Sequence, residues 1–250
     1  MAHQRKYLVY LLILMLAFVG CSAKRRKTAG GKDSGELYGK ALSRFNSGKY
    51  ETALEDFQDV KNFYPESLEA LRAEIKIADC HFYLSEYEEA VAIYEEFRKL
   101  HPYHEDIPYV LFQLGEAYFK QIRTVDRDPN PARNALSNFQ YLVENYPPSI
   151  FTKTAQEKIA ICREHLAGHE FLIGRFYYRK KKYQGAVARF EQVFVTYPDS
   201  EVAPKALFYM GKALLNLSLN DRAEATFREI THQYPNSEYA SKAKTILQTQ

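Results

Sequence analysis

The sequence predicts an all-α fold built from five copies of a helix pair. In five segments, an alanine is followed by an aromatic residue four positions later, an apolar residue at seven and a proline at twelve. The spacing 0, +4, +7 places these side chains on one face of an α-helix. Proline then ends that helix, because it has no amide hydrogen to donate. The alanines are Ala53, Ala90, Ala135, Ala186 and Ala223, and the aromatic residues are Phe57, Tyr94, Phe139, Phe190 and Phe227.

A second helical stretch precedes each of these segments. A small residue stands twelve positions before the alanine, where it lets two helices approach closely. These small residues are Ala41, Ala78, Gly115, Gly174 and Gly211. Gly115 fits the frame only if TVDRDPNP is an eight-residue insert in the turn between the two helices of the third pair.

The fourth copy carries 14 extra residues, and they lie before Gly174, around IFTKTAQEKIAICREHLA. Fourteen residues are close to four helical turns at 3.6 residues per turn. We therefore expect a lengthened first helix whose buried face does not rotate.

The paired-helix pattern, with Tyr50, Tyr87 and Tyr183 three positions before the alanine, resembles the tetratricopeptide repeat. The resemblance implies a right-handed superhelical solenoid over residues 36–250. Its repeats would span about 36–66, 67–103, 104–148, 149–199 and 200–247. Such a solenoid buries a continuous core and presents a concave groove, so its usual function is partner binding.

The N-terminus has the pattern of an export signal. Arg5 and Lys6 precede YLVYLLILMLAFVG, which is shorter than the roughly 20 residues that span a bilayer but fits the apolar region of a signal peptide. LAFVGC resembles the lipobox of bacterial lipoproteins, which implies lipidation of Cys21 and, with Ser22 next, sorting to the outer membrane. We expect a signal peptide at 1–20 and a lipidated cysteine with a flexible basic tether at 21–35. An uncleaved signal anchor is the alternative.

The charge balance argues against a nucleic-acid partner. The net charge of +3 arises from 34 basic and 31 acidic residues, whereas nucleic-acid binders are usually more basic. The basic stretch HEFLIGRFYYRKKKY has a place in the repeat frame, where Lys180–Lys182 form the turn between two helices. Cations suit the end of the first of these helices.

No residue cluster in the sequence favours an enzyme or a cofactor. Cys162, His165 and His169 follow one another at helical spacing, but zinc needs a fourth ligand or an open position with supporting contacts. The pattern HLAGH also lacks the glutamate of a catalytic zinc motif. We therefore expect no metal site. Cys80 and Cys162 are interpreted as buried free thiols, with a disulfide as the alternative.

The resemblance to tetratricopeptide proteins also identifies groove positions, which come from the first helix of each pair. Many of these positions are aromatic, and we expect neighbouring repeats to bury about half of the rings. The remainder would suit extended, aromatic-containing peptides. The predicted groove rings are Tyr38, Phe45, Phe82, Tyr83, Tyr109, Phe112, Phe119, Phe171, Tyr178 and Phe208, and Arg175 and Arg179 lie on the same face.

Taken together, the export signal, the five repeats and the run HLAGHEFLIGRFYYRKKKYQGAVARFEQV resemble the BamD (YfiO) family of outer-membrane assembly lipoproteins. The resemblance implies a non-enzymatic scaffold, lipid-anchored in the outer membrane and facing the periplasm. Its N-terminal repeats would bind unfolded outer-membrane proteins. Its C-terminal repeats would dock the POTRA domains of the barrel-assembly subunit, and other assembly lipoproteins would be further partners.

Two alternative functions belong to different classes of protein. A coordinator of the Tol–Pal type also uses repeats ending in Tyr-Pro, but that family typically lacks a lipid anchor and carries an N-terminal coiled coil. A peptidoglycan-acting enzyme would need a carboxylate pair or metal site, and the sequence displays neither pattern.

Overall fold

The computed structural model describes residues 33–249, in which every regular element is a helix and no strand occurs. None of the described helices is both long and apolar enough to cross a membrane. The predicted signal peptide, Cys21 and nearly all of the tether lie outside the described residues. The helices are α2 (Ser34–Asn46), α3 (Tyr50–Phe63), α4 (Leu68–Tyr83), α5 (Tyr87–Leu100), α6 (Ile107–Lys120), α7 (Asn130–Asn145), α8 (Thr152–Arg179), α9 (Tyr183–Thr196), α10 (Ala203–Asn216), α11 (Asn220–Gln233) and α12 (Glu238–Thr249).

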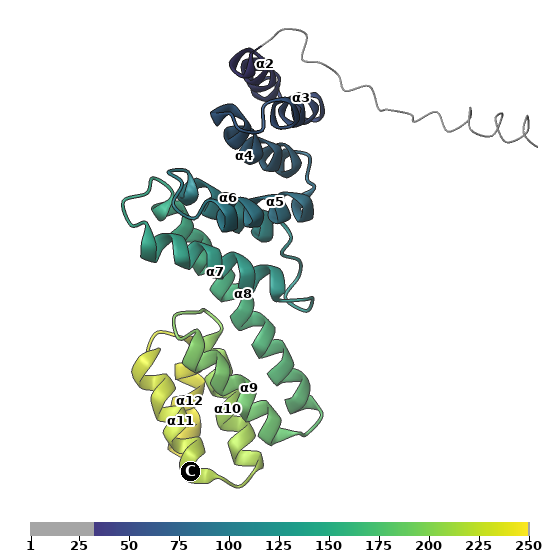
Figure 1. Ribbon diagram of the computed structural model, residues 1–250. Coiled ribbons are helices and arrows are strands. Elements are labelled where there is room, and N and C mark those ends of the chain that lie inside the picture. Colours follow the sequence, from purple (N-terminus) through teal and green to yellow (C-terminus); the bar gives the residue numbers. More distant parts are fainter. Residues whose placement is uncertain (1–32, 250) are drawn as a thin grey trace, which may run out of the picture.

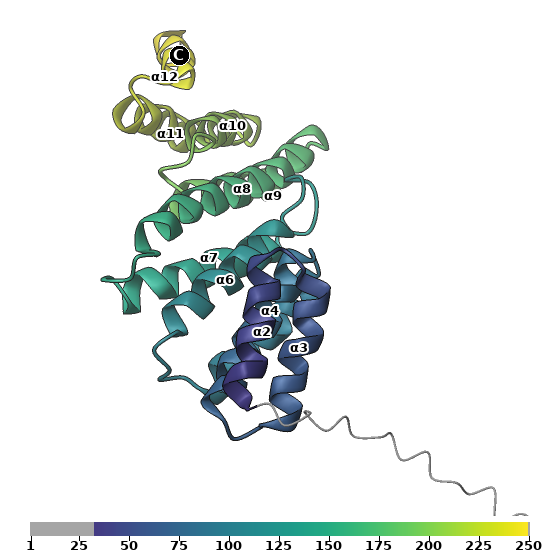
Figure 2. The same cartoon turned by 90° about the horizontal axis from the view of Figure 1, so that it is seen from above.

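The helices form five consecutive pairs followed by a single last helix, as Figure 1 shows. Each helix packs mainly against its neighbours in the sequence, and α2 with α4, α4 with α6, α8 with α10 and α10 with α12 also touch. These additional contacts place first helices side by side along one face. The stack runs from α2 at one end to α12 at the other (Figure 2). The predicted all-α solenoid of tetratricopeptide-like helix pairs is confirmed.

The repeat residues form the core of each pair. All five alanines and all five aromatic residues of the pattern have no exposed surface. A Cβ atom on Gly174 would lie only 2.6 Å from Cε1 of Phe190, so the ring of α9 rests on the backbone of α8. The same contact joins Gly115 to Phe139 and Gly211 to Phe227. The predicted function of the small residue, close approach of two helices, is confirmed at these three positions.

The second helices end where the sequence pattern predicts. The residue after the helix precedes the proline, and it leaves the helical region with φ between −126° and −132° and ψ between 52° and 57°. The proline ring causes this change, because it clashes with a helical conformation of the preceding residue. Tyr64, His101, Tyr146, Tyr197 and Tyr234 occupy this position.

Three-residue turns join the helices of four pairs. The middle residue of each turn has a positive φ, which is 72° at Gly48, 65° at Ser85, 57° at Lys181 and 59° at Ser218. Residues 180–182 therefore form an ordinary intra-pair turn, as the repeat frame predicts. In the third pair, residues 121–129 replace this turn with a longer loop, hereafter the insert loop.

Helix α8 has the predicted extra length but not the predicted face. It contains 28 residues, against 14 in α6 and in α10. Cys162 and Leu166 pack into the core of the preceding helices, whereas Ala167 and Phe171 pack into the core of the following ones. Leu166 and Ala167 are consecutive residues, which an α-helix separates by about 100°. The expectation of an unrotated face is wrong, because one helix serves two differently oriented cores.

The two described cysteines are free thiols. Cys80 packs in the core formed by α2, α3 and α4, and Cys162 packs in the next core along the stack. Both have no exposed surface. The interpretation as buried thiols is confirmed.

Candidate partner-binding grooves

The first group of predicted rings lies where α2, α3 and α4 meet. Tyr83 stacks on Tyr50 with ring centroids 4.8 Å apart and an interplanar angle of 11°. Phe45 packs edge-on against both tyrosines, at 5.3 and 5.5 Å. Tyr83 remains 49% exposed. Because its partners fix its orientation, the ring offers a rigid aromatic surface to a ligand.

A buried carboxylate that the sequence analysis missed lies beside these rings. Asp79 in α4 has no exposed surface and accepts hydrogen bonds from three donors. Tyr94 and Tyr109 donate from their hydroxyls at 2.5 and 2.8 Å, and Lys76 donates from Nζ at 2.6 Å. Burial and the Asp79 charge raise the pKa of both tyrosines, so both stay protonated donors at neutral pH. This network joins α4, α5 and α6.

Lys76, the cation of this network, contacts aromatic rings of the first and third helix pairs from its place in the second. Lys76 Nζ lies 5.0 Å from the centroid of Phe45 and 5.7 Å from that of Tyr109. Tyr38 packs on Phe57 at 5.5 Å, and burial raises its pKa while Lys76 and Arg72 act in the opposite direction. We use the name N-terminal groove, after the position that the repeat frame predicts, for the surface of Tyr38, Phe45, Lys76, Phe82, Tyr83 and Tyr109. This surface is aromatic, and the ammonium group of Lys76 lies among its rings.

Two of the three predicted rings of α6 pack against a residue outside the predicted set. Phe151, just before α8, stacks on Phe112 at 4.9 Å and lies 5.8 Å from Tyr109. Phe119, at the other end of α6, lies under the ammonium group of Lys158 at 4.1 Å. Phe151 precedes the helix and so falls outside the repeat frame.

In the C-terminal half, the rings converge on Tyr209, which the sequence analysis also missed. The Tyr209 ring lies 5.8 Å from Phe171, 5.7 Å from Tyr178 and 6.0 Å from Phe190. The guanidinium of Arg175 lies 5.0 Å from the same ring. Tyr209 follows a predicted groove position by one residue, so the repeat frame alone gives no signal for it.

The exposure of the predicted rings differs from the expectation. Phe171 is only 5% exposed and belongs to the core, which corrects its placement on an open groove wall. Tyr83 is open, and the other eight rings are half-buried. The expected division, in which neighbouring repeats bury about half of the rings, is replaced by partial burial of most of them. Arg175 is half-buried and Arg179 is exposed. Neighbouring rings contact seven of the half-buried rings, and the eighth, Phe119, lies against the ammonium group of Lys158.

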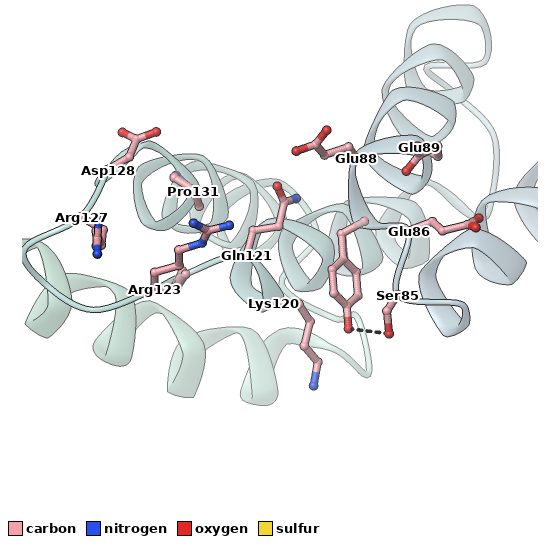
Figure 3. A pocket seen from close by; sticks show the side chains of 12 residues that line it. Ser85, Glu86, Glu88, Glu89, Lys120, Gln121, Arg123, Arg127, Asp128 and Pro131 are labelled. Carbon is pink, nitrogen blue, oxygen red and sulfur yellow. Dashed lines mark hydrogen bonds between the residues drawn. The ribbon is translucent and has the colours of Figure 1, made fainter.

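The insert loop borders a cleft of about 750 Å³ at the edge of the stack (Figure 3). One wall carries Glu86 of the α4–α5 turn with Glu88 and Glu89 at the start of α5. The other wall carries Lys120, Arg123 and Arg127. The Tyr87 hydroxyl donates to Ser85 Oγ at 3.4 Å. The walls are of opposite charge and hold no nucleophile beside a base.

The two histidines of the candidate metal cluster hold the insert loop on α8. His165 donates from Nε2 to the carbonyl oxygen of Arg123 at 2.9 Å, and His169 donates from Nδ1 to that of Val125 at 2.7 Å. Between residues 33 and 249, no group of three metal-ligating side chains is close enough to hold an ion. The imidazoles therefore serve as hydrogen-bond donors that fix a loop.

Comparison with known proteins places this architecture in a family. The family model described as "YfiO: Outer membrane lipoprotein" matches residues 31–226. The outer membrane protein assembly factor BamD of Rickettsia prowazekii is 30% identical over 219 residues, covering 88% of this chain and 87% of the relative. The factor of the same name from Vibrio cholerae is 29% identical over 226 residues, covering 86% and 93%.

A solved tetratricopeptide repeat protein from Parabacteroides merdae aligns over 91% of this chain and 88% of its own length, with 18% identity and a TM-score of 0.44. The sequence matches extend over most of the chain and of the relatives. On these matches, the chain belongs to the YfiO family of outer membrane lipoproteins.

Proposed function

We propose that the protein is a non-enzymatic scaffold of the outer-membrane β-barrel assembly complex. The observation that carries the proposal is the family match over residues 31–226, together with relatives that are named outer membrane protein assembly factors. A solenoid of helix pairs is suited to this function, since it offers long binding surfaces without a reaction centre.

In this proposal, the N-terminal groove binds unfolded outer-membrane proteins. Its exposed Tyr83 ring, which Tyr50 holds by stacking, and its half-buried rings match extended peptides with aromatic side chains. Lys76 supplies a cation within reach of a peptide carboxylate, while Asp79 holds it in position.

The groove can be tested with a fluorescent peptide from the C-terminus of an outer-membrane barrel protein. Tyr83→Ala should weaken binding by about tenfold, the loss of one aromatic stacking contact. Tyr103→Ala is the matched control, because Tyr103 is 99% exposed and lies outside the groove. Equal affinities for the two variants would contradict substrate binding at this groove.

The C-terminal repeats would dock the POTRA-containing barrel subunit, with other assembly lipoproteins bound elsewhere on the stack. Arg179 is exposed at the end of α8, and Phe176 nearby is 49% exposed. The variant Arg175→Glu/Arg179→Glu should lose binding to the purified barrel subunit. Unchanged binding would remove both arginines from the interface.

Lipidation of Cys21 would hold the scaffold on the periplasmic face of the outer membrane. Several acyl chains anchor a protein stably, and confinement raises its effective concentration near partners. Cys21→Ala should move the protein from the membrane fraction to the soluble fraction. Unchanged acylation and fractionation would contradict the lipid anchor.

A further inference from the structure

A second groove lies where α8 passes from one core to the next. It has a volume of about 590 Å³ and lies between the insert loop and the start of α10. Its apolar lining consists of Val125, Ile161, Gly168, Phe171, Leu172 and Val202. Ile161 and Leu172 are 52% and 40% exposed. We call this hollow the seam groove.

The seam groove is a consequence of the long helix. Because the buried face of α8 turns between Leu166 and Ala167, a third face of the helix stays uncovered. Ile161, Gly168 and Leu172 follow at spacings of seven and four residues, so they share that face. Gly168 has no side chain, and a Cβ there would meet only Val125, at 3.4 Å. The groove is therefore deepest at Gly168, where no side chain fills it.

Fixed polar contacts hold both walls. His165 and His169 fasten the insert loop on one side. On the other, Glu164 Oε2 accepts a hydrogen bond from the backbone amide of Glu201 at 2.9 Å, just before α10. The walls are thus preorganised, which lowers the entropic cost of binding a ligand.

Two cations at the α10 side have no acidic partner within 4.0 Å among the residues that the structure describes. Arg175 Cζ lies 5.8 Å from the Phe171 centroid, and Lys205 Nζ lies 5.0 Å from the same ring. The pKa of Glu238 is lowered mainly by its hydrogen bond from Lys242, and the charge of Lys205 lowers it further. Both cations line the hollow. The groove therefore combines an apolar floor with two cations that form no ion pair among the described residues, and Glu164 is the one acidic residue in its lining.

We propose that the seam groove binds a peptide segment of a partner protein in which apolar side chains stand beside carboxylates. The apolar side chains would cover Ile161 and Leu172, and the carboxylates would pair with Arg175 and Lys205. A walled hollow suits an inserted segment, whereas a flat membrane surface cannot reach its floor. This site is separate from the N-terminal groove and does not depend on substrate binding there. It shares Arg175 with the surface proposed to dock the barrel subunit, so its test uses isolated peptides and pairs Arg175 with Lys205 rather than Arg179.

The test uses the full lipidated chain in detergent micelles and a display library of random 12-residue peptides. Selected peptides should be enriched in Leu, Ile, Val or Phe together with Asp or Glu. Their affinities are then measured by fluorescence polarisation. Arg175→Glu/Lys205→Glu should weaken binding by about tenfold, the equivalent of two partly exposed ion pairs.

Three matched variants separate the site from other effects. Lys99→Glu/Lys244→Glu changes the charge equally at exposed positions outside the groove and should bind normally. Leu172→Glu repels carboxylates without touching the stacked cations and should also weaken binding. Tyr83→Ala should leave the affinity for the selected peptides unchanged. If this variant alone weakened their binding, the peptides would belong to the N-terminal groove.

Several results would overturn the proposal. These are selection of basic peptides, absence of any selected peptide, and affinities that neither groove variant alters. A loss of binding to phosphatidylglycerol vesicles in Arg175→Glu/Lys205→Glu, with no peptide affected, would instead identify a membrane-contact surface and also overturn it.

Discussion

The ring of Phe190 rests directly on the backbone of Gly174, and a Cβ atom at Gly174 would lie 2.6 Å from Cε1 and 2.7 Å from Cδ1 of that ring. Phe190 has no exposed surface and packs against Phe171 and Tyr209. The buried ring is therefore held between these two rings and the backbone of Gly174.

Gly174→Ala should lower the free energy of unfolding by up to about 2 kcal/mol. Overpacking costs about 1–3 kcal/mol, and the better helix propensity of alanine offsets about 1 kcal/mol of it. Urea unfolding followed by circular dichroism measures the difference.

Gly168→Ala in the same helix is the matched control. Its new methyl group would meet only Val125 at an ordinary contact distance of 3.4 Å. This variant should be more stable than the parent by up to about 1 kcal/mol. Changes of the same sign in both variants would contradict the packing argument.

The Asp79 network should contribute to stability through its buried hydroxyl donors. Tyr94→Phe removes the donor at 2.5 Å and should cost about 1–3 kcal/mol, because a buried charged acceptor loses a hydrogen bond. Tyr118→Phe removes a solvent-accessible hydrogen bond to Glu95 and should cost less than about 0.5 kcal/mol. Similar costs for both variants would show that burial of Asp79 does not matter.

The buried thiols should react slowly while the protein is folded. Burial raises the pKa of Cys80 and of Cys162 to about 12, and only the thiolate is a good nucleophile. Iodoacetamide at pH 8 should modify both cysteines rapidly in urea and only slowly without it. Mass spectrometry of the two peptides measures the rates, and fast modification in the folded protein would contradict the burial.

The same thiols make the free energy of unfolding depend on pH in the alkaline range. Their pKa is about 12 in the folded protein, whereas an exposed thiol has a pKa of about 9.0. The thiols of the unfolded chain therefore ionise first, so the contribution is complete below pH 9 and is lost as the pH rises toward 12. The buried hydroxyls of Tyr94 and Tyr109 act in the same direction. The urea midpoint should be lower at pH 10.5 than at pH 8, and an unchanged midpoint would contradict this.

His165 and His169 should determine how firmly the insert loop is held. Replacing both with alanine removes hydrogen bonds to two loop carbonyls. Amide exchange in residues 121–129 should become faster, while the thermal midpoint changes little, because the loop lies outside the repeat core. His232→Ala, at an exposed position of α11, is the control. Unchanged loop exchange would mean that the histidines do not hold it.

The repeat core was predictable because its signals are local and repeated. The positions 0, +4 and +7 share a helix face, and Gly174 pairs with Phe190 at the same offset that joins Gly211 to Phe227. Prolines then mark the helix ends. Each copy of the pattern supports the others, so one exceptional copy does not obscure it.

The sites were predictable only in part, because they depend on contacts between distant segments. Asp79 becomes a buried acceptor only when Tyr94 and Tyr109 reach it from two later helices. The histidines bind carbonyl oxygens, which every residue has, so no side-chain pattern identifies the partners. The rotation of the α8 face likewise depends on how two cores are oriented in space.

The most direct test of the proposed function is purification of the protein from crosslinked cell envelopes, followed by mass spectrometry of the bound proteins. If the protein is a scaffold of outer-membrane assembly, the POTRA-containing barrel subunit and the assembly lipoproteins should be recovered with it. Recovery of Tol components with no barrel-assembly subunit would contradict it.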